Sequence, residues 1–218
     1  MIALFHWFVK ITGYIPERLV FGTKVYYRDK KRQSRRIQGK AIVICNHQTL
    51  YDFAVLLFVF PGRTLRALAA EVLYDGRPVL GTLLKCFGMI RVDRDAKDFS
   101  FLDRCAKILD KGGVVEIYPE ARLPKPGEER PLPFKPSAVY LALETDTPII
   151  PVYSTGKLFC KERNRVIIGT PLNLREMSDE SLTPARNMEI LTEKLRGTVI
   201  ELQQQLEATV EAEKKDRK

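Results

Sequence analysis

The sequence predicts an α/β fold: a mixed, largely parallel central sheet flanked by helices. One observation behind this prediction is the pattern from residue 41 onward, where short apolar runs alternate with segments of helical length. Such alternation is typical of sheets covered by helices on their faces. The other is size and composition, because 218 residues with 45% hydrophobic content suffice for one domain with a substantial core.

Individual elements follow from the same pattern. Six apolar runs read as buried strands: residues 41–45, 65–70, 89–93, 114–118, 148–153 and 165–169. Four segments between them suit helices: residues 52–60, 79–87, 99–110 and 137–144. Residues 122–136 contain five prolines, so we expect an exposed loop there. After Thr183, apolar residues recur at steps of three or four as far as Val210, which predicts one long helix with a single apolar stripe.

The first 27 residues are apolar and aromatic but are interrupted by charges such as Lys10 and Glu17. They are too polar for a spanning helix and lack the small-residue cleavage site of a secretory signal. The pattern predicts two short helices, hinged near Pro16, that lie in a membrane interface. We therefore divide the chain into an interfacial segment (1–27), an α/β domain (28–183) and a C-terminal helix with a charged tail (184–218).

Positive charge is concentrated in one part of the chain. The net charge is +9, and residues 24–40 alone hold eight basic residues against one acid. This basic segment predicts contact with an anionic surface, and its position beside the aromatic stretch favours membrane headgroups. The alternative is a core helix followed by a solvated basic loop. A non-catalytic module that binds acidic lipids or nucleic acid would also explain the charge.

Several classes of site are disfavoured. The four cysteines are widely spaced and there are only two histidines, so we expect reduced cysteines and no metal site. The sequence has no G-x-S-x-G, no G-x-x-x-x-G-K-[ST] and no G-x-G-x-x-G motif. These absences argue against a serine hydrolase, a P-loop and a Rossmann phosphate turn.

The candidate chemistry begins at His47, which follows the first predicted strand of the alternating region. Catalytic groups gather where the strands of such sheets end. Thr49 and Asp52 form a pattern typical of a helix N-terminus, which would bring the Asp52 carboxylate near the imidazole. That carboxylate would fix the ring tautomer and leave the other nitrogen as a base. Equally, Asp52 could only cap the helix.

Charged residues follow other predicted strands. Arg94 comes after the third strand of the series, and Glu120 and Arg122 come after the fourth. Two arginines at one edge of the sheet could hold a phosphate between them. Each could instead form an ordinary surface salt bridge.

Four blocks of the sequence resemble the glycerolipid acyltransferase family. In order, that family carries NH-x-x-x-x-D, G-x-I-x-x-x-R, F-P-E-G-T-R and a V-P-I-x-P-V-like strand. The matching segments here are Asn46–Asp52, Gly88–Arg94, Tyr118–Arg122 and Thr147–Val152, with Phe134–Lys135 before the last. The match covers about residues 40 to 170, and four blocks in this order are a specific signal. The resemblance implies the glycerolipid acyltransferase fold and makes residues 28–183 the acyltransferase domain.

The resemblance also implies a reaction. A fatty acyl group would pass from a thioester of coenzyme A or acyl carrier protein to a lysophosphatidate-like acceptor, with no metal, cofactor or acyl-enzyme. Glycerol 3-phosphate or another lysolipid is the alternative acceptor. The expected location is peripheral or monotopic, on the cytoplasmic face of a membrane, with the basic segment on anionic lipid and no nucleic-acid partner.

Roles for individual residues follow from the matching positions. His47 would act as general base on a glycerol hydroxyl, and Asp52 would orient it. The residues expected to bind or position the substrate are Gly88, Arg94, Glu120, Arg122 and Lys135.

Two departures from the family pattern concern the acceptor site. The third block reads YPEAR, so Arg122 follows Glu120 by two residues rather than three, and Ala121 replaces a glycine. Shortly before the second block, Ala69-Ala70-Glu71 stands where the family usually has A-K-x-E, so one positive contact is expected to be absent. We therefore expect the reaction type to be closer to the family's than the acceptor.

Overall fold

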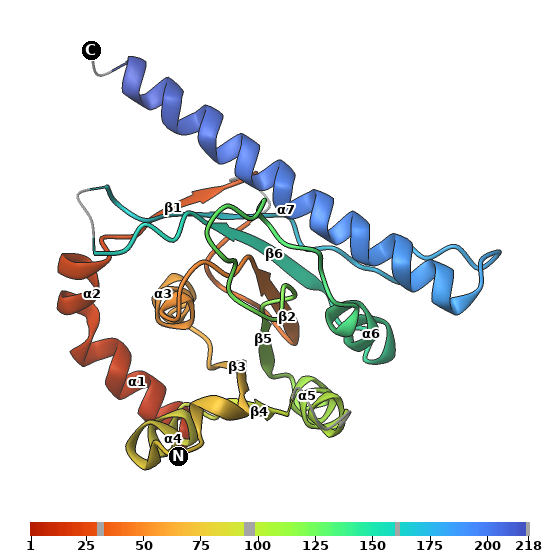
Figure 1. Ribbon diagram of the computed structural model, residues 1–218, viewed down its shortest axis with the longest axis horizontal. Coiled ribbons are helices and arrows are strands. Elements are labelled where there is room, and N and C mark those ends of the chain that lie inside the picture. The colour runs from red at the N-terminus through yellow and green to blue at the C-terminus, as the bar shows by residue number, and fades with distance from the viewer. Residues whose placement is uncertain (30–32, 94–98, 160–161, 217–218) are drawn as a thin grey trace.

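The computed structural model describes residues 1–29, 33–93, 99–159 and 162–216 (Figure 1). Within these ranges seven strands form one sheet in the order β1-β7-β6-β2-β5-β3-β4. The strands are β1 (Lys24–Tyr27), β2 (Ala41–Cys45), β3 (Leu65–Ala70), β4 (Ile90–Val92), β5 (Val114–Ile117), β6 (Ile149–Ser154) and β7 (Arg165–Ile168). From β6 to β4 all neighbours are parallel, whereas β7 is antiparallel to β6 and parallel to β1. The predicted mixed, largely parallel sheet is confirmed.

Helices cover both faces of the sheet. They are α1 (Ile2–Thr12), α2 (Tyr14–Val20), α3 (Asp52–Val59), α4 (Pro78–Cys86), α5 (Ser100–Asp110), α6 (Ser137–Glu144) and α7 (Pro184–Lys215), with a 3₁₀ turn η1 (Glu71–Leu73). Figure 1 shows α5, α6 and α7 on one face and α3, α1 and α2 on the other. Successive side chains of a strand point to opposite faces of the sheet, which gives the protein two cores. Ile42 and Ile44 of β2 join the core under α5–α7, whereas Val43 and Cys45 join the core under α3.

The strands and helices predicted from residue 41 onward are present, with ends that match or differ by one residue. The predicted long C-terminal helix is also confirmed. Its N-terminus is capped by the Thr183 hydroxyl, which accepts a hydrogen bond from the Arg186 N–H at 3.4 Å. Its apolar stripe packs on the domain through Leu191, Leu195, Val199, Leu202 and Leu206, which are all buried.

Two features near the N-terminus differ from the prediction. Residues 24–27, expected in the interfacial segment, form the edge strand β1, because Val25 and Tyr27 pack on one core and Tyr26 on the other. The break between the first two helices falls at Gly13 rather than at Pro16. A proline is tolerated in the first turn of a helix. At Gly13 a Cβ would lie 2.9 Å from the Phe58 ring, so only glycine fits this crossing without movement of its neighbours.

The basic segment is largely tied to the rest of the protein. Lys24 and Arg28 form ion pairs with carboxylates of α7, at 2.8 and 3.0 Å. Arg35 and Lys40 donate hydrogen bonds to backbone carbonyls. Residues 30–32 lie outside the described part of the chain. The number of charges that the described residues leave for an anionic surface is therefore smaller than the composition indicates.

Helix α1 carries its polar side chains inward. His6 Nε2 contacts the Phe87 carbonyl at 2.9 Å, and Lys10 Nζ donates to three carbonyls of residues 60–63. Seven large apolar side chains of α1 and α2 instead face outward and are more than half exposed; they are Leu4, Trp7, Phe8, Ile11, Tyr14, Ile15 and Leu19. None of the helices in the described residues combines the length and hydropathy needed to cross a bilayer.

Candidate active site

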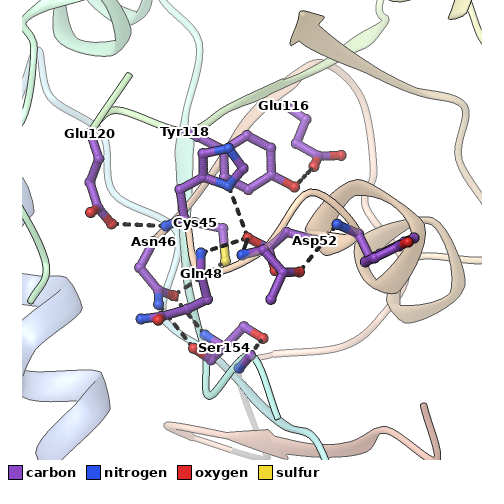
Figure 2. A network of polar contacts seen from close by, with 12 residues as sticks. Cys45, Asn46, Gln48, Asp52, Glu116, Tyr118, Glu120 and Ser154 are labelled. Atoms are coloured by element: carbon purple, nitrogen blue, oxygen red, sulfur yellow. Dashed lines mark hydrogen bonds and ion pairs between the residues drawn. The ribbon is translucent and has the colours of Figure 1, made fainter. Parts of the chain in front are cut away.

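A polar network occupies the turn between β2 and α3, at the carboxyl edge of the sheet (Figure 2). His47 Nδ1 lies 2.9 Å from Asp52 Oδ2. The imidazole is partly exposed, with 19% of its side chain accessible, whereas Asp52 is 1% exposed. The approach of the carboxylate to the imidazole that the spacing predicted is present in the structure. Their catalytic roles stay a prediction.

The Asp52 carboxylate is buried but well supplied with donors. Besides His47, its Oδ2 accepts hydrogen bonds from the backbone N–H groups of Gln48 and Thr49, at 2.7 and 2.9 Å. The Thr49 hydroxyl donates to Oδ1 at 2.9 Å. Thr49 thus donates to Asp52 rather than capping the helix, and α3 begins at Asp52 itself. With an ionised carboxylate at Nδ1, that ring nitrogen carries the proton and Nε2 is the acceptor.

A second pair of residues supports the imidazole from its face. The Tyr118 ring stacks on His47 with 4.4 Å between ring centroids and 25° between planes. The Tyr118 hydroxyl donates to Glu116 Oε1, and Figure 2 shows this pair behind the turn. Glu116 is fully buried, and its Oε2 has no partner among the described residues. Burial raises the pKa of Glu116 to about 8, so the carboxyl group is largely protonated at neutral pH.

The motifs of the sequence do not predict the pairing of Glu116 with Tyr118. The signal for it was a single acid inside an otherwise apolar strand, in the run VVEIY. A carboxyl group at such a position must be neutralised or hydrogen-bonded. Tyr118, two residues later, lies on the same face of the strand and supplies the bond.

Glu120 holds the backbone of the site. Its Oε1 accepts the His47 N–H at 2.8 Å and its Oε2 accepts the Leu132 N–H at 3.0 Å. The side chain is 4% exposed, and this burial raises its pKa although both hydrogen bonds oppose the rise. Next to His47, the Asn46 amide bridges to the Ser154 backbone at 2.7 and 2.9 Å and joins the end of β2 to the end of β6. Through its two hydrogen bonds, Glu120 fixes the backbone of His47 relative to that of Leu132.

The other residues predicted to bind substrate form no described contact with this network. Arg122 is exposed and forms a bidentate ion pair with Glu128, at 2.7 and 2.8 Å. Lys135 is exposed at the end of the proline-rich loop. Gly88 precedes β4, at the amino edge of the sheet and away from His47. Arg94 lies outside the described residues.

The third block has an unusual backbone. Ala121 has φ of 58°, a left-handed conformation that glycine adopts without strain. The residue that replaces the family's glycine thus keeps a glycine-like conformation. The described residues contain no group of three or more His, Cys, Asp or Glu side chains placed to hold a metal ion.

Comparison with known proteins shows what the chain is similar to. It is 30% identical over 128 residues to the 1-acyl-sn-glycerol-3-phosphate acyltransferase of Cocos nucifera, across 57% of this chain and 40% of that protein. It is 29% identical to the human 1-acyl-sn-glycerol-3-phosphate acyltransferase beta, across 75% and 56%. The chain thus spans about half the length of these relatives. The Bacillus subtilis enzyme of the same name is 26% identical, across 85% of this chain and 90% of its own.

A solved structure shares the fold. The 1-acyl-sn-glycerophosphate acyltransferase of Thermotoga maritima superposes with a TM-score of 0.59 over 89% of this chain and 78% of its own, at 18% identity. The family model described as Acyltransferase matches residues 23–155, more than half of the chain and the whole of the network around His47. The chain therefore belongs to the Acyltransferase family.

Proposed function

We propose that the protein transfers a fatty acyl group from a thioester to the free hydroxyl of lysophosphatidic acid and so forms phosphatidic acid. The observation that carries the proposal is the His47 imidazole, bound by a buried carboxylate at Nδ1 and without a described hydrogen bond at Nε2. Relatives named 1-acyl-sn-glycerol-3-phosphate acyltransferase, at about 30% identity, support this acceptor. Acyl-coenzyme A and acyl carrier protein are both compatible donors.

The proposed reaction is a direct transfer. His47 Nε2 takes the proton of the acceptor hydroxyl, and the hydroxyl oxygen of the acceptor attacks the carbonyl carbon of the thioester. The tetrahedral intermediate collapses with cleavage of the carbon–sulfur bond, and the departing thiolate takes the proton from the imidazolium. Asp52 stabilises the imidazolium and keeps Nε2 directed outward. General base catalysis of this kind contributes about 10²- to 10⁴-fold.

The test is thiol release from a long-chain acyl-coenzyme A, with and without lysophosphatidic acid in mixed micelles. We expect release to need the acceptor and to fall at least about 100-fold in His47→Ala, while the circular dichroism spectrum stays unchanged. A Thr209→Ala variant on the exposed face of α7 is the matched control. Release that persists undiminished in His47→Ala contradicts the proposed role. Release with glycerol 3-phosphate or another lysolipid, but not with lysophosphatidic acid, changes the acceptor.

We also propose that Arg94, Arg122 and Lys135 contact the acceptor phosphate. Arg122 and Lys135 are exposed on the loop that leaves Glu120, so both can exchange water or the Glu128 carboxylate for a phosphate. Replacing Arg122 with alanine should raise KM for lysophosphatidic acid about tenfold and leave KM for uncharged monoacylglycerol unchanged. An equal change in both KM values would mean that Arg122 only holds the loop.

The location follows from the apolar face of α1 and α2. We propose that residues 1–27 dock on the cytoplasmic face of a membrane, as a peripheral or monotopic anchor, with the basic segment near anionic headgroups. Aromatic side chains extend this face toward the active site. Phe159 contacts Phe21 and Tyr51, with ring centroids 5.6 and 5.2 Å apart, and Tyr51 directly precedes α3. Acceptor lipid would then reach His47 without leaving the interface.

A further inference from the structure

A buried carboxyl group is linked to the face of the His47 imidazole through one aromatic ring. Glu116 points from β5 toward the core under α3, as Val114 does two residues earlier. Its Oε1 accepts the hydrogen bond of the Tyr118 hydroxyl, and the Tyr118 ring stacks on His47 (Figure 2). The proton transfer proposed for His47 and Asp52 makes no use of this link.

The hydroxyl of Tyr118 departs from the family pattern. The third block of the glycerolipid acyltransferases begins with phenylalanine, and Tyr118 stands at that position. Phenylalanine would supply the stacking ring but would form no hydrogen bond with Glu116. The stacked ring is therefore common to both residues, whereas the link to the buried carboxyl group is specific to the tyrosine.

Of the two linked groups, Glu116 is the one that can release a proton. Burial and the nearby Glu116 and Asp52 raise the pKa of Tyr118 well above its ordinary value, so the phenol keeps its proton. Burial also raises the pKa of Glu116 to about 8, although the hydrogen bond from Tyr118 opposes the rise. The carboxyl group of Glu116 therefore changes its charge just above neutral pH.

The surroundings of Glu116 leave its negative charge unbalanced. The titratable groups that face it are Tyr118 from the same segment, Asp52 from α3 and Cys45 from β2. Asp52 is an acid, and Cys45 is a buried thiol whose pKa is itself raised by burial. Glu116 forms no ion pair with the described residues, and its Oε2 has no hydrogen-bond partner among them. Of the side chains in this network, the His47 imidazole is the one that can become positive.

We propose that Glu116 and Tyr118 are positioning residues that act through His47, and that loss of the Glu116 proton stabilises the imidazolium form of that ring. An ionised carboxylate accepts a stronger hydrogen bond from the Tyr118 hydroxyl. The phenol ring then gains electron density, which stabilises a cation stacked on its face. The negative charge of Glu116 acts in the same direction. Acyl transfer through a general base forms this imidazolium, so the part of the inference that concerns rate rests on the proposed function.

The first test follows the ring nitrogens of histidine by ¹⁵N NMR from about pH 7 to 9.5. The chain has two histidines, so a spectrum of His47→Ala assigns both. We expect the His47 signals of the native protein to move with a midpoint near pH 8, the pKa of Glu116, and we expect no such movement in Glu116→Gln. His6 is an internal control, because burial lowers its pKa and the ring stays neutral over this range. Glu211→Gln, at an exposed position of α7, is the matched control variant.

Replacing Tyr118 separates the effect of its ring from that of its hydroxyl. Tyr118→Phe should make the movement smaller and shift its midpoint above pH 8, because the hydroxyl lowers the pKa of Glu116. Glu116→Leu/Tyr118→Phe has no buried acid and should show no movement near pH 8. An unchanged movement in Tyr118→Phe would overturn the role of its hydroxyl. An equal movement in Glu116→Gln and the native protein would overturn the whole proposal.

The second test measures kcat for acyl transfer over the same pH range with saturating substrates. We expect kcat of the native protein to rise about two- to thirtyfold through pH 8, as a cation–aromatic contact gains strength. The profile of Glu116→Gln should lack this rise, with KM for the acceptor equal in the two proteins. The substrates titrate equally with both proteins, so the difference between the profiles reports Glu116.

The two tests distinguish failure of this inference from failure of the proposed function. If the His47 signals move as expected but the native protein transfers no acyl group, the proposed function fails and the link from Glu116 to His47 stands. If the native protein is a transferase and its His47 signals do not respond to Glu116, the inference fails and the proposed function stands. Parallel kcat profiles for the native protein and Glu116→Gln refute the effect of Glu116 on rate.

Discussion

His47 is positioned by three side chains that reach it from different directions. Asp52 binds a ring nitrogen, Tyr118 stacks on the ring face, and Glu120 accepts the backbone N–H. A base held in this way loses little conformational freedom when substrate binds, which is how positioning lowers a barrier. Of these contacts, only the one with Asp52 follows from spacing in the sequence, because Tyr118 and Glu120 follow β5, more than 70 residues later in the chain.

Replacing Tyr118 with phenylalanine tests how its hydroxyl supports the site. The ring would still stack on His47, but Glu116 would lose its hydrogen bond and become a buried carboxyl without a described partner. We expect a loss of about 1–3 kcal/mol in the free energy of unfolding, measured by urea denaturation. A Glu116→Leu/Tyr118→Phe double variant should recover most of that loss. If the double variant loses the sum of the two single losses, the pair does not act as a unit.

The raised pKa of Glu116 predicts a dependence of stability on pH. The carboxyl group titrates at about 8 in the folded protein and near 4.5 when solvated. Between these pH values the native state holds a proton that the unfolded state has lost. Ionisation of Glu116 in the unfolded state therefore lowers the free energy of unfolding as pH rises from 4.5 to 8. Glu116→Gln should have a flatter profile of unfolding free energy across this window. Parallel profiles for the two proteins would show that Glu116 is already ionised in the native state.

Helix α3 is secured at both ends by polar contacts. Asp52 binds the turn before it, and the carbonyls of its last turn accept hydrogen bonds from Arg35 and Lys10. Cations at this end also interact favourably with the helix dipole. Because Lys10 belongs to α1, the helix that bears the apolar outer face is joined to the helix that carries Asp52.

Replacing Lys10 with methionine should loosen this connection. Methionine fills a similar volume but removes the donor that the carbonyls of Phe60, Pro61 and Arg63 share. We expect a loss of about 1.5–3 kcal/mol in unfolding free energy, since hydrogen bonds from a charged group are stronger than neutral ones. Lys194→Met, on the exposed face of α7, is the control. Equal stability of Lys10→Met and the native protein would show that water replaces the ammonium group at no cost.

The elements that the sequence predicted well are those with a local signal. The bounds of β2 and β3 match because β2 is an uninterrupted apolar run and β3 is apolar except for Arg66, and both lie between polar turns. β1 has no such signal, because it is a strand only through pairing with β7, about 140 residues later. The gathering of cations at the amino ends of β3 and β5 could not be predicted either, since residues such as Arg63, Lys85 and Lys107 come from separate segments that only the fold brings together.

At the scale of the whole molecule, the two edges of the sheet differ in chemistry. The carboxyl edge carries the His47 network and exposed aromatic side chains, whereas a hollow at the amino edge is lined by six cations, Arg63, Arg66, Lys85, Arg104, Lys107 and Lys111. The proposed lipid acceptor would reach His47 from the carboxyl edge, where these aromatic side chains lie.

Docking through α1 and α2 predicts a specific loss of membrane binding. In a Phe8→Ser/Leu19→Ser variant, two exposed apolar side chains disappear from the outer face. Each contributes about 1.5–3 kcal/mol when fully buried, so vesicle affinity in a flotation assay should fall at least about tenfold. Ile190→Ser, an exposed apolar position on α7, should bind as the native protein does. Unchanged flotation of the double variant would place the docking surface elsewhere.

The single tryptophan of the chain, Trp7, lies on the outer face of α1 with 57% of its surface exposed. An indole in water emits at long wavelength, and its emission shifts to the blue when acyl chains replace the water. The protein therefore contains an optical probe at the surface where docking is proposed, with no other indole to obscure it. Fluorescence and thiol release can be recorded in one cuvette, so the order of membrane arrival and turnover can be timed without a label.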